Sequence, residues 1–218
     1  GNALLGSATT PLLGRAWQRD QVRFDGAPND TLTFRVSFDS FYQLHQHADR
    51  LLYQPALAML GEVRGRRIVD AYGGVGTFGI RLAALGARSV EIVEAHPSAV
   101  RDAEDNVRRN GVESTTRVHR MPFAEYRTKG ESVDWLIVDP PRAGLGADGV
   151  ARVADLAPAN ILHVACSLRS LARDLEGLSA TGYEVTAAHC ADLFPHTEHV
   201  EVAVALTRRS RAQRFRGT

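Results

Sequence analysis

A cysteine stands where a pattern typical of a buried strand gives way to a predicted helix. Cys166 follows the apolar segment Ile161–Ala165 and precedes Leu168–Ala180, whose apolar spacing predicts the helix. The N-terminus of a helix lowers the pKa of a thiol and favours the thiolate, which is the nucleophilic form. Cys166 is therefore a candidate nucleophile, although a small buried structural cysteine is the simpler interpretation of this residue taken alone.

A second chemical position is the motif Asp139-Pro140-Pro141-Arg142, which follows the apolar segment Val133–Val138. Two consecutive prolines remove two N–H donors and restrict the backbone, which leaves a firm apolar surface. A planar base could lie against this wall, with the carboxylate of Asp139 beside it. A proline-bounded loop without chemistry is the alternative interpretation.

A third position lies in the ten residues from Asp192 to Glu201, which hold three acids and two histidines. His196 and His199 could suggest a metal site, but the turn proline before them and the lack of a third clear ligand argue against it. We expect no metal. Glu201 opens a predicted buried strand, and burial raises the pKa of a carboxyl group. Glu201 is therefore a candidate general base.

These positions need elements that bring them together, and the segment Arg67–Gly79 predicts such elements. Its sequence RIVDAYGGVGTFG indicates a buried strand, a glycine-rich turn and a helix, with Gly74, Gly76 and Gly79 in a G-x-G-x-x-G pattern. Glycines let the backbone turn tightly and approach a ligand closely. The segment therefore predicts a nucleotide-type site at the carboxyl edge of a parallel sheet.

The acids beside this turn distinguish between nucleotide ligands. Asp70 ends the first strand, where a carboxylate would repel a pyrophosphate and so disfavour NAD or FAD. It suits a ligand with an ammonium and a sulfonium group, which is S-adenosylmethionine (SAM). Glu94 ends the second predicted strand, where an acid accepts hydrogen bonds from ribose hydroxyls in NAD and SAM sites alike. A glycine turn in an unrelated α/β protein remains the alternative.

Strand and helix patterns alternate along the chain from Arg66 onward. This alternation predicts an α/β fold with a doubly wound, mostly parallel seven-stranded sheet. The predicted strands are Arg67–Ala71, Ser89–Val93, Thr115–His119, Val133–Val138, Ile161–Ala165, Tyr183–Ala188 and Glu201–Leu206, and the predicted helices are Thr77–Leu85, Ser98–Asn110, Asp148–Leu156 and Leu168–Ala180. Upstream, Thr31–Phe38 predicts a strand, a short strand is expected near Gln21–Phe24, and Ser40–Gly61 predicts a helix kinked at Pro55.

Composition is that of an ordinary globular protein, which we expect in the cytoplasm. The chain has 218 residues, of which 44% are hydrophobic and 23% charged. No apolar run approaches the roughly 18 residues that span a bilayer. The start GNALLGSATTPLLG lacks the basic beginning and apolar core of a signal peptide.

The charged residues and cysteines constrain partners only weakly. A net charge of +1 neither requires nor excludes nucleic acid. Lys129 is the only lysine, and the tail Arg208–Arg216 holds five arginines, which suit a solvated terminus or an arm that contacts RNA. The two cysteines form no metal motif, and we expect Cys190 to be structural.

Several motifs occur together in a fixed order. They are Phe41-x-Gln43, the glycine loop DAYGGVGTFG, Asp139-Pro-Pro-Arg, Cys166, the LARD motif at 171–174 and Thr197-x-His199-Val-Glu201. This set resembles the RNA uracil-C5 methyltransferases, which make 5-methyluridine in tRNA and large-subunit rRNA. The resemblance runs from about Val36 to Leu206 and implies a Rossmann-like class I SAM-dependent methyltransferase fold.

The resemblance also implies roles for the matched positions. Cys166 would add to C6 of uracil, which lets C5 take the methyl group, and Glu201 would then remove the C5 proton. Phe41 would pack on a uracil extruded from its stack, with Pro140 and Arg142 also on the substrate side. The residues expected at the SAM site are Gln43, Asp70, Tyr72, Gly74, Gly76, Thr77, Glu94 and Asp139.

Three departures from the family pattern stand out. Gly73 stands where relatives often have cysteine, and His45 replaces a common asparagine. The residues after Cys166 read Ser-Leu-Arg-Ser rather than Asn-Pro-Ala-Thr, which bears on the rigidity of the backbone beside the nucleophile.

We expect residues 1–35 to be the end of a central subdomain or an N-terminal extension, 36–207 the catalytic domain, and 208–218 a basic tail. The expected partner is RNA, either tRNA or rRNA, with no membrane and a monomeric enzyme. One alternative is a SAM-dependent methyltransferase acting on N6 of adenine or N2 of guanine, which would need no thiol. Others are a SAM-binding RNA module without turnover and an NAD-dependent oxidoreductase.

Overall fold

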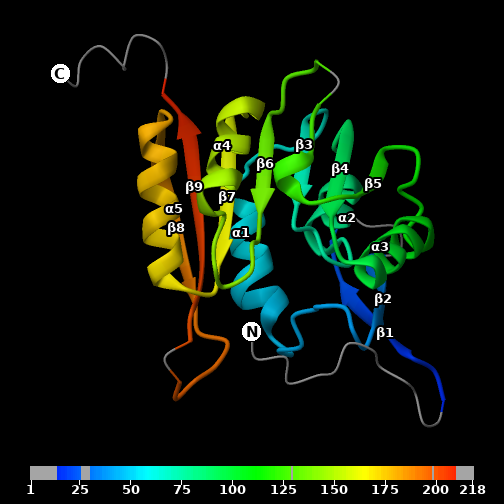
Figure 1. The fold of residues 1–218 in the computed structure, drawn as a ribbon. Coiled ribbons are helices and arrows are strands. Elements are labelled where there is room, and N and C mark those ends of the chain that lie inside the picture. Colours follow the sequence, from blue (N-terminus) through cyan, green and yellow to red (C-terminus); the bar gives the residue numbers. More distant parts are fainter. Residues whose placement is uncertain (1–13, 26–29, 129, 198, 210–218) are drawn as a thin grey trace.

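The computed structural model describes residues 14–25, 30–128, 130–197 and 199–209, which form a seven-stranded sheet flanked by helices and a two-stranded hairpin (Figure 1). The strands are β1 (Trp17–Arg23), β2 (Thr31–Ser37), β3 (Arg67–Ala71), β4 (Ser89–Glu94), β5 (Thr116–Arg120), β6 (Trp135–Val138), β7 (Asn160–Ala165), β8 (Tyr183–Ala191) and β9 (Glu201–Arg208). The helices are the π-helix η2 (Asp49–Tyr53), α1 (Gln54–Ala58), α2 (Thr77–Ala84), α3 (Pro97–Arg109), the 3₁₀-helix η3 (Phe123–Glu125), α4 (Gly146–Leu156) and α5 (Leu168–Ala180).

The large sheet has the strand order β5-β4-β3-β6-β7-β9-β8. Neighbours from β5 to β7 are parallel, whereas β9 is antiparallel to both β7 and β8. The chain builds outward from β3 to β5 and then returns to the other side of β3 with β6. The loops after β3 and β6 therefore diverge, which opens a crevice at the carboxyl edge of the sheet. The predicted doubly wound, mostly parallel seven-stranded sheet is confirmed.

Helices cover both faces of the sheet because its central strands are apolar on both sides. Every residue of β3 and β6 is buried. On one face, Ile80 of α2 and Val107 of α3 join a buried cluster with residues of η2 and α1. On the other, Val153 of α4 and Leu171 of α5 join a second cluster. This double cover holds the strand ends, and the loops that follow them, in fixed positions.

The predicted helix over Ser40–Gly61 is wrong in its first half. The helical segment begins only at Asp49, runs for one π-turn and continues as α1. Leu44, one of the apolar residues whose spacing suits a helix, is exposed. Pro55 lies in the first turn of α1, directly after the π-turn, so its missing N–H coincides with the change from π- to α-helix. The kink expected at Pro55 stays a prediction.

The hairpin β1–β2 packs on the same face as α2 and α3. Leu32 and Phe34 of β2 are fully buried in the cluster that also contains Ile68 of β3. The short strand expected near Gln21–Phe24 begins earlier, at Trp17. The boundary at residues 35 and 36 stays a prediction, and Lys129 and most of the basic tail lie outside the described residues.

Candidate active site

Two acids hold the glycine loop between β3 and α2. Asp70 accepts a hydrogen bond from the Gly79 N–H at 2.7 Å, so the acid at the end of β3 fixes the first turn of α2. Glu94, at the end of β4, accepts one from the Gly74 N–H at 3.0 Å and one from the His96 N–H at 2.7 Å. The loop is therefore held from the strand before it and from the neighbouring strand.

The backbone of the loop is left-handed at three positions. Gly74 and Gly76 have φ angles of 55° and 91°, and Tyr72 has a φ of 58°. Glycine adopts this conformation freely, whereas a tyrosine is strained there and needs its surroundings to hold it. The Tyr72 ring packs against Phe123, with the ring centroids 5.7 Å apart. Strain of this kind is concentrated at functional sites, which draws attention to this turn.

Asp70 lies beneath the loop and is only 1% exposed. Burial raises the pKa of Asp70 to about 7, the hydrogen bond from Gly79 opposes this rise, and the charges of Asp139 and Glu94 add to it. The structure thus gives Asp70 a role in shaping the loop that sequence reasoning missed. Its predicted attraction for a cationic ligand stays a prediction.

A cavity lies between the glycine loop and the segment that follows β2. Its lining residues are Phe41, Tyr42, Gln43, Tyr53, Asp70, Tyr72, Gly73, Gly74, Val75, Thr77, Phe78 and Asp139. Most of the residues predicted for the SAM site are therefore brought together. Gly76 and Glu94 are not in the lining, although Glu94 touches it through the Gly74 N–H.

Cys166 and Glu201 meet at the same edge because β7 and β9 are antiparallel. Ala165 pairs with Val202 in this ladder, which places Cys166 opposite Glu201. Asp139 follows β6, the other neighbour of β7, and so ends at the same edge. The candidate nucleophile and the candidate base therefore adjoin the acid that lines the cavity.

The prediction that the helix end lowers the pKa of Cys166 is wrong in direction. Burial raises the pKa of the Cys166 thiol, and Glu201 and Asp139 raise it further, while Arg142 lowers it. Ser167 also accepts the Ser170 N–H as the cap of α5, so part of the positive helix end is already neutralised. Burial and the two carboxylates therefore favour the protonated thiol, and Arg142 opposes them.

The two carboxylates beside Cys166 are themselves shifted toward their protonated forms. Burial raises the pKa of Glu201, as predicted, while Arg142 and His199 lower it. Burial and the charge of Glu201 raise the pKa of Asp139 to about 7. Arg142 is exposed, and it is the cation that offsets charge at both Cys166 and Glu201.

A buried pair that sequence reasoning missed holds the loop carrying Arg142. Asp174 of α5 accepts hydrogen bonds from the Leu145 N–H at 2.8 Å and the Gly146 N–H at 3.4 Å, and lies 3.0 Å from Nε2 of His163. Burial alone would raise the pKa of Asp174, but the hydrogen bonds from His163 and Leu145 outweigh it and lower the pKa. The LARD motif was the available signal, because Asp174 is its last residue.

Other features do not contain the candidate catalytic residues. A hollow of about 1040 Å³ is bordered by β1, η2, α1 and Arg81, and none of the candidate catalytic residues lines it. Cys190 is exposed on β8 and unpaired. Within the described ranges, no group of three or more histidine, cysteine, aspartate or glutamate residues could hold a metal ion. None of the helices described is long and apolar enough to cross a bilayer.

The strand order and the glycine loop define a class I SAM-dependent methyltransferase fold, and solved structures share it. The crystal structure of tRNA (uracil-54, C5)-methyltransferase from Pyrococcus abyssi matches with a TM-score of 0.73 and 32% identity, over 89% of this chain and 45% of that one. The M. jannaschii tRNA m1G37 methyltransferase matches with a TM-score of 0.65 over 91% of this chain and 59% of that one. At 13% identity it supports the fold alone.

Sequence comparisons relate the chain to RNA methyltransferases. The model for tRNA (Uracil-5-)-methyltransferase matches residues 123–209, and the model named Conserved hypothetical protein 95 matches residues 53–162. A protein described as an uncharacterized RNA methyltransferase from Lactiplantibacillus plantarum is 33% identical over 95% of this chain and 44% of its own length. The comparisons thus relate the chain to RNA methyltransferases, and its residues 123–209 to the tRNA (Uracil-5-)-methyltransferase model. It spans less than half the length of the first curated relatives it matches.

Proposed function

We propose that this chain is the catalytic part of an enzyme that methylates C5 of a uridine in tRNA or rRNA, with SAM as the methyl donor. The observation that carries the proposal is the position of Cys166 opposite Glu201, one residue beyond the last pair of the β7–β9 ladder and beside the acid-lined cavity. A methyltransferase acting on an exocyclic amino group would need neither a thiol nor a base so placed. The P. abyssi structure bears the matching activity in its name.

The acidic residues of the cavity suit the positive charge of SAM, which is also the cofactor that the related enzymes imply. Asp70 and Asp139 line it, and both carboxyl groups have a pKa of about 7. A bound cation would favour their ionised forms, and SAM carries a sulfonium. Glu94 would accept hydrogen bonds from the ribose, because each of its oxygens has a lone pair left after the bonds from Gly74 and His96. When bound, SAM supplies a methyl group on positively charged sulfur.

The chain's own residues would do the rest of the chemistry. The sulfur of Cys166 bonds to C6 of the uracil, which raises electron density at C5 so that this carbon can take the methyl group. Glu201 then accepts the proton from C5, the C5–C6 double bond forms again, and the C6–S bond breaks. Arg142 would favour the thiolate at the start, since it lowers the pKa of Cys166.

The substrate side would take an extruded base. Phe41 is 76% exposed at the mouth of the cavity and would stack on the uracil. Pro140, which follows Asp139, would form the wall behind that base. Which RNA is methylated, the monomeric state and a cytoplasmic location stay predictions.

RNA containing 5-fluorouridine tests the proposal, because fluorine at C5 prevents the final proton removal and leaves the C6–S bond intact. In the presence of SAM, the wild-type chain should form a complex with fluorinated tRNA or rRNA fragments that survives a denaturing gel. Cys166→Ala should form none. Cys190→Ala is the matched control, since Cys190 is exposed and distant in sequence, and it should behave as wild type.

Methyl transfer to uridine by the Cys166→Ala variant would contradict the proposed mechanism. Methyl transfer to adenine or guanine in unmodified RNA would support the amino-group alternative. SAM binding with neither transfer nor a covalent complex on any RNA would favour a binding module.

A further inference from the structure

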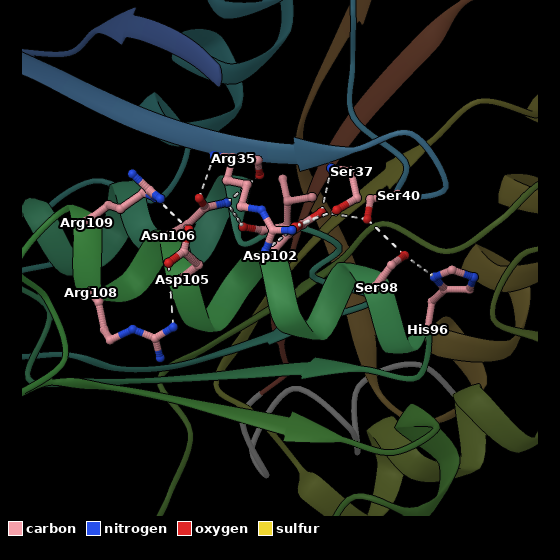
Figure 2. Close-up of polar contacts among 11 residues, drawn as sticks. Arg35, Ser37, Ser40, His96, Ser98, Asp102, Asp105, Asn106, Arg108 and Arg109 are labelled. Atoms are coloured by element: carbon pink, nitrogen blue, oxygen red, sulfur yellow. Dashed lines mark hydrogen bonds and ion pairs between the residues drawn. The ribbon is translucent and has the colours of Figure 1, made fainter. Parts of the chain in front are cut away.

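The outer edge of β2 is paired with a helix rather than with a strand. In the described part of the chain, β1 is the one strand that pairs with β2. On the other side, three side chains of helix α3 and its C-cap, at Asp102, Asn106 and Asn110, bond to the β2 backbone. Figure 2 shows the contacts of Asp102 and Asn106. We call these three residues the α3 ladder.

The α3 ladder reproduces the pairing that a neighbouring strand would make. Asn110 accepts the Thr33 N–H and donates to the Thr33 carbonyl, both at 2.9 Å. Asn106 accepts the Arg35 N–H at 2.6 Å and donates to the Arg35 carbonyl at 3.0 Å. The spacing fits because four residues of helix advance about 6 Å and two residues of strand about 6.6 Å.

Asp102 completes the α3 ladder at its other end. It accepts hydrogen bonds from the Ser37 N–H at 2.7 Å, the Ser37 hydroxyl at 2.9 Å and the Ser40 hydroxyl at 2.7 Å. Ser40 immediately precedes Phe41. The ladder therefore fixes the start of the segment that forms the outer wall of the cavity.

Asn106 also reaches the glycine loop. The second hydrogen of its Nδ2 group is donated to the Val75 carbonyl at 3.0 Å, so one fully buried side chain joins β2 to the loop. Val75 lies between Gly74 and Gly76, the two glycines with positive φ. Glu94 already holds this stretch through the Gly74 N–H, and Asn106 adds a contact to the carbonyl of the next residue.

The two walls joined by Asn106 are close together. A methyl group added at Gly74 would lie 3.7 Å from the Phe41 carbonyl oxygen, so the segment after β2 lies directly over the loop. Asn106 fixes the loop, and Asp102, one turn earlier, fixes the segment. The distance between the two walls is therefore set from α3.

We propose that Asn106 is a positioning residue for the SAM pocket, which holds the glycine loop in register with the wall formed by Phe41 and Gln43. The inference rests on the proposed SAM binding. Without the Nδ2 donor, the Val75 carbonyl would lose its partner, and the loop would lose one of the contacts that keep it shaped for the ligand. The contrasting explanation is that the α3 ladder only attaches the hairpin.

Asn110 offers a matched control for this proposal. Asn106→Asp would lose the bonds to the Arg35 and Val75 carbonyls, and Asn110→Asp would lose those to the Thr33 and Asn106 carbonyls. Both changes remove two donor bonds and add one charge at the same α3–β2 contact, but only the first touches the glycine loop. SAM affinity is measured by titration calorimetry, and stability by the urea midpoint of unfolding.

We expect both variants to unfold at lower urea concentration, and only Asn106→Asp to bind SAM about tenfold more weakly. Asn110→Asp should stay within about twofold of wild type. Equal SAM affinities in the two variants would overturn the proposal, because the ladder would then only hold the hairpin. If either aspartate variant fails to fold, Asn106→Ser and Asn110→Ser repeat the comparison, since a serine hydroxyl is too short to span these contacts.

The wild-type titration separates this inference from the proposed function. Tight SAM binding by wild type together with equal binding by both variants refutes only the role of Asn106. Absence of SAM binding by the wild-type chain would refute the proposed cofactor and this inference with it.

Discussion

The two walls of the cavity are built in different ways. On the glycine-loop side, the side chains of Asp70, Glu94 and Asn106 each bond to a backbone group of the loop. On the opposite side, Phe41 lines the cavity but is 76% exposed. Arg142, which follows Asp139 outside the lining, is exposed as well. One wall is fixed before any ligand arrives, and the other leaves its contact groups uncovered.

The difference follows from what each wall would bind. A small ligand of constant shape is bound best by a preformed pocket, because little order must then be created on binding. An extruded base arrives attached to a large polyanion, so aromatic and cationic groups must stay accessible to it. The contrast predicts that substitutions on one side will change SAM binding and those on the other will change turnover on RNA.

The largest effect is expected at Glu201. Glu201→Gln removes the base without changing the shape of the side chain, so turnover should fall by about a thousandfold, within the range for a lost general base. SAM affinity should stay within about twofold. Steady-state rates with a 5-methyluridine readout measure the first quantity, and calorimetry the second.

A covalent complex should also accumulate in this variant, because Cys166 cannot leave while the C5 proton remains. Glu184→Gln, at an exposed position of β8, is the control and should turn over normally. Full activity of Glu201→Gln would assign proton removal to another group.

Phe41 tests whether an exposed ring serves the substrate side. Phe41→Ala should lower kcat/KM for RNA by about tenfold or more, since a stacked base contributes about 1–3 kcal/mol. SAM affinity should change little. Phe38→Ala is the matched control, because Phe38 is 52% exposed nearby but does not line the cavity. An equal loss of SAM affinity would move Phe41 to the cofactor side.

A substitution at Asp174 tests whether its buried contacts position the loop that carries Arg142. An amide at this position has one accepting oxygen, whereas the carboxylate receives the Leu145 and Gly146 N–H groups and faces His163. Asp174→Asn should therefore cost about 1–3 kcal/mol of stability and lower turnover by about tenfold as the loop shifts. Asp25→Asn, which removes an exposed ion pair with Arg23, should do neither.

Rates and urea midpoints measured on the two variants distinguish the roles. A stability loss in Asp174→Asn with unchanged turnover would show that the loop position does not matter for catalysis.

The sequence predicted the sheet well because buried parallel strands are short apolar runs with turn residues at their ends. Arg67–Ala71 and Leu168–Ala180 begin and end as predicted. The helix prediction failed in the first half of Ser40–Gly61. Apolar residues recur there at helical spacing, but Leu44 is exposed rather than packed against the core. Periodicity reports what an element could bury, not what lies opposite it.

The sequence predicted the candidate site only to the extent that it predicted where the strands end. Two of its residues, Asp139 and Cys166, follow the carboxyl ends of the parallel strands β6 and β7. Glu201 lies at the same edge because the antiparallel strand β9 begins there. The rise in the pKa of Cys166 was not predictable, because it depends on two carboxylates from other strands. Asn106 reads as an ordinary polar residue of an amphipathic helix, since its partners lie more than thirty residues away in sequence.

The smallest expected effect is the pH dependence of SAM binding, which involves two acids that line the cavity. Asp70 and Asp139, each with a pKa of about 7, are largely protonated below that pH and ionised above it. A cation favours the ionised forms, so SAM affinity should rise with pH, by about threefold between about pH 6.5 and about pH 7.5 for one carboxylate. The free protein should lose stability as the pH rises from about 4 to about 7 and level off above, because in this window the carboxyls are ionised in the unfolded chain but still protonated in the fold. S-adenosylhomocysteine lacks the sulfonium charge and should show a weaker pH dependence in calorimetry. Affinity for SAM that falls with pH, or an equal dependence for both ligands, would mean that these acids shape the loop without attracting the charge.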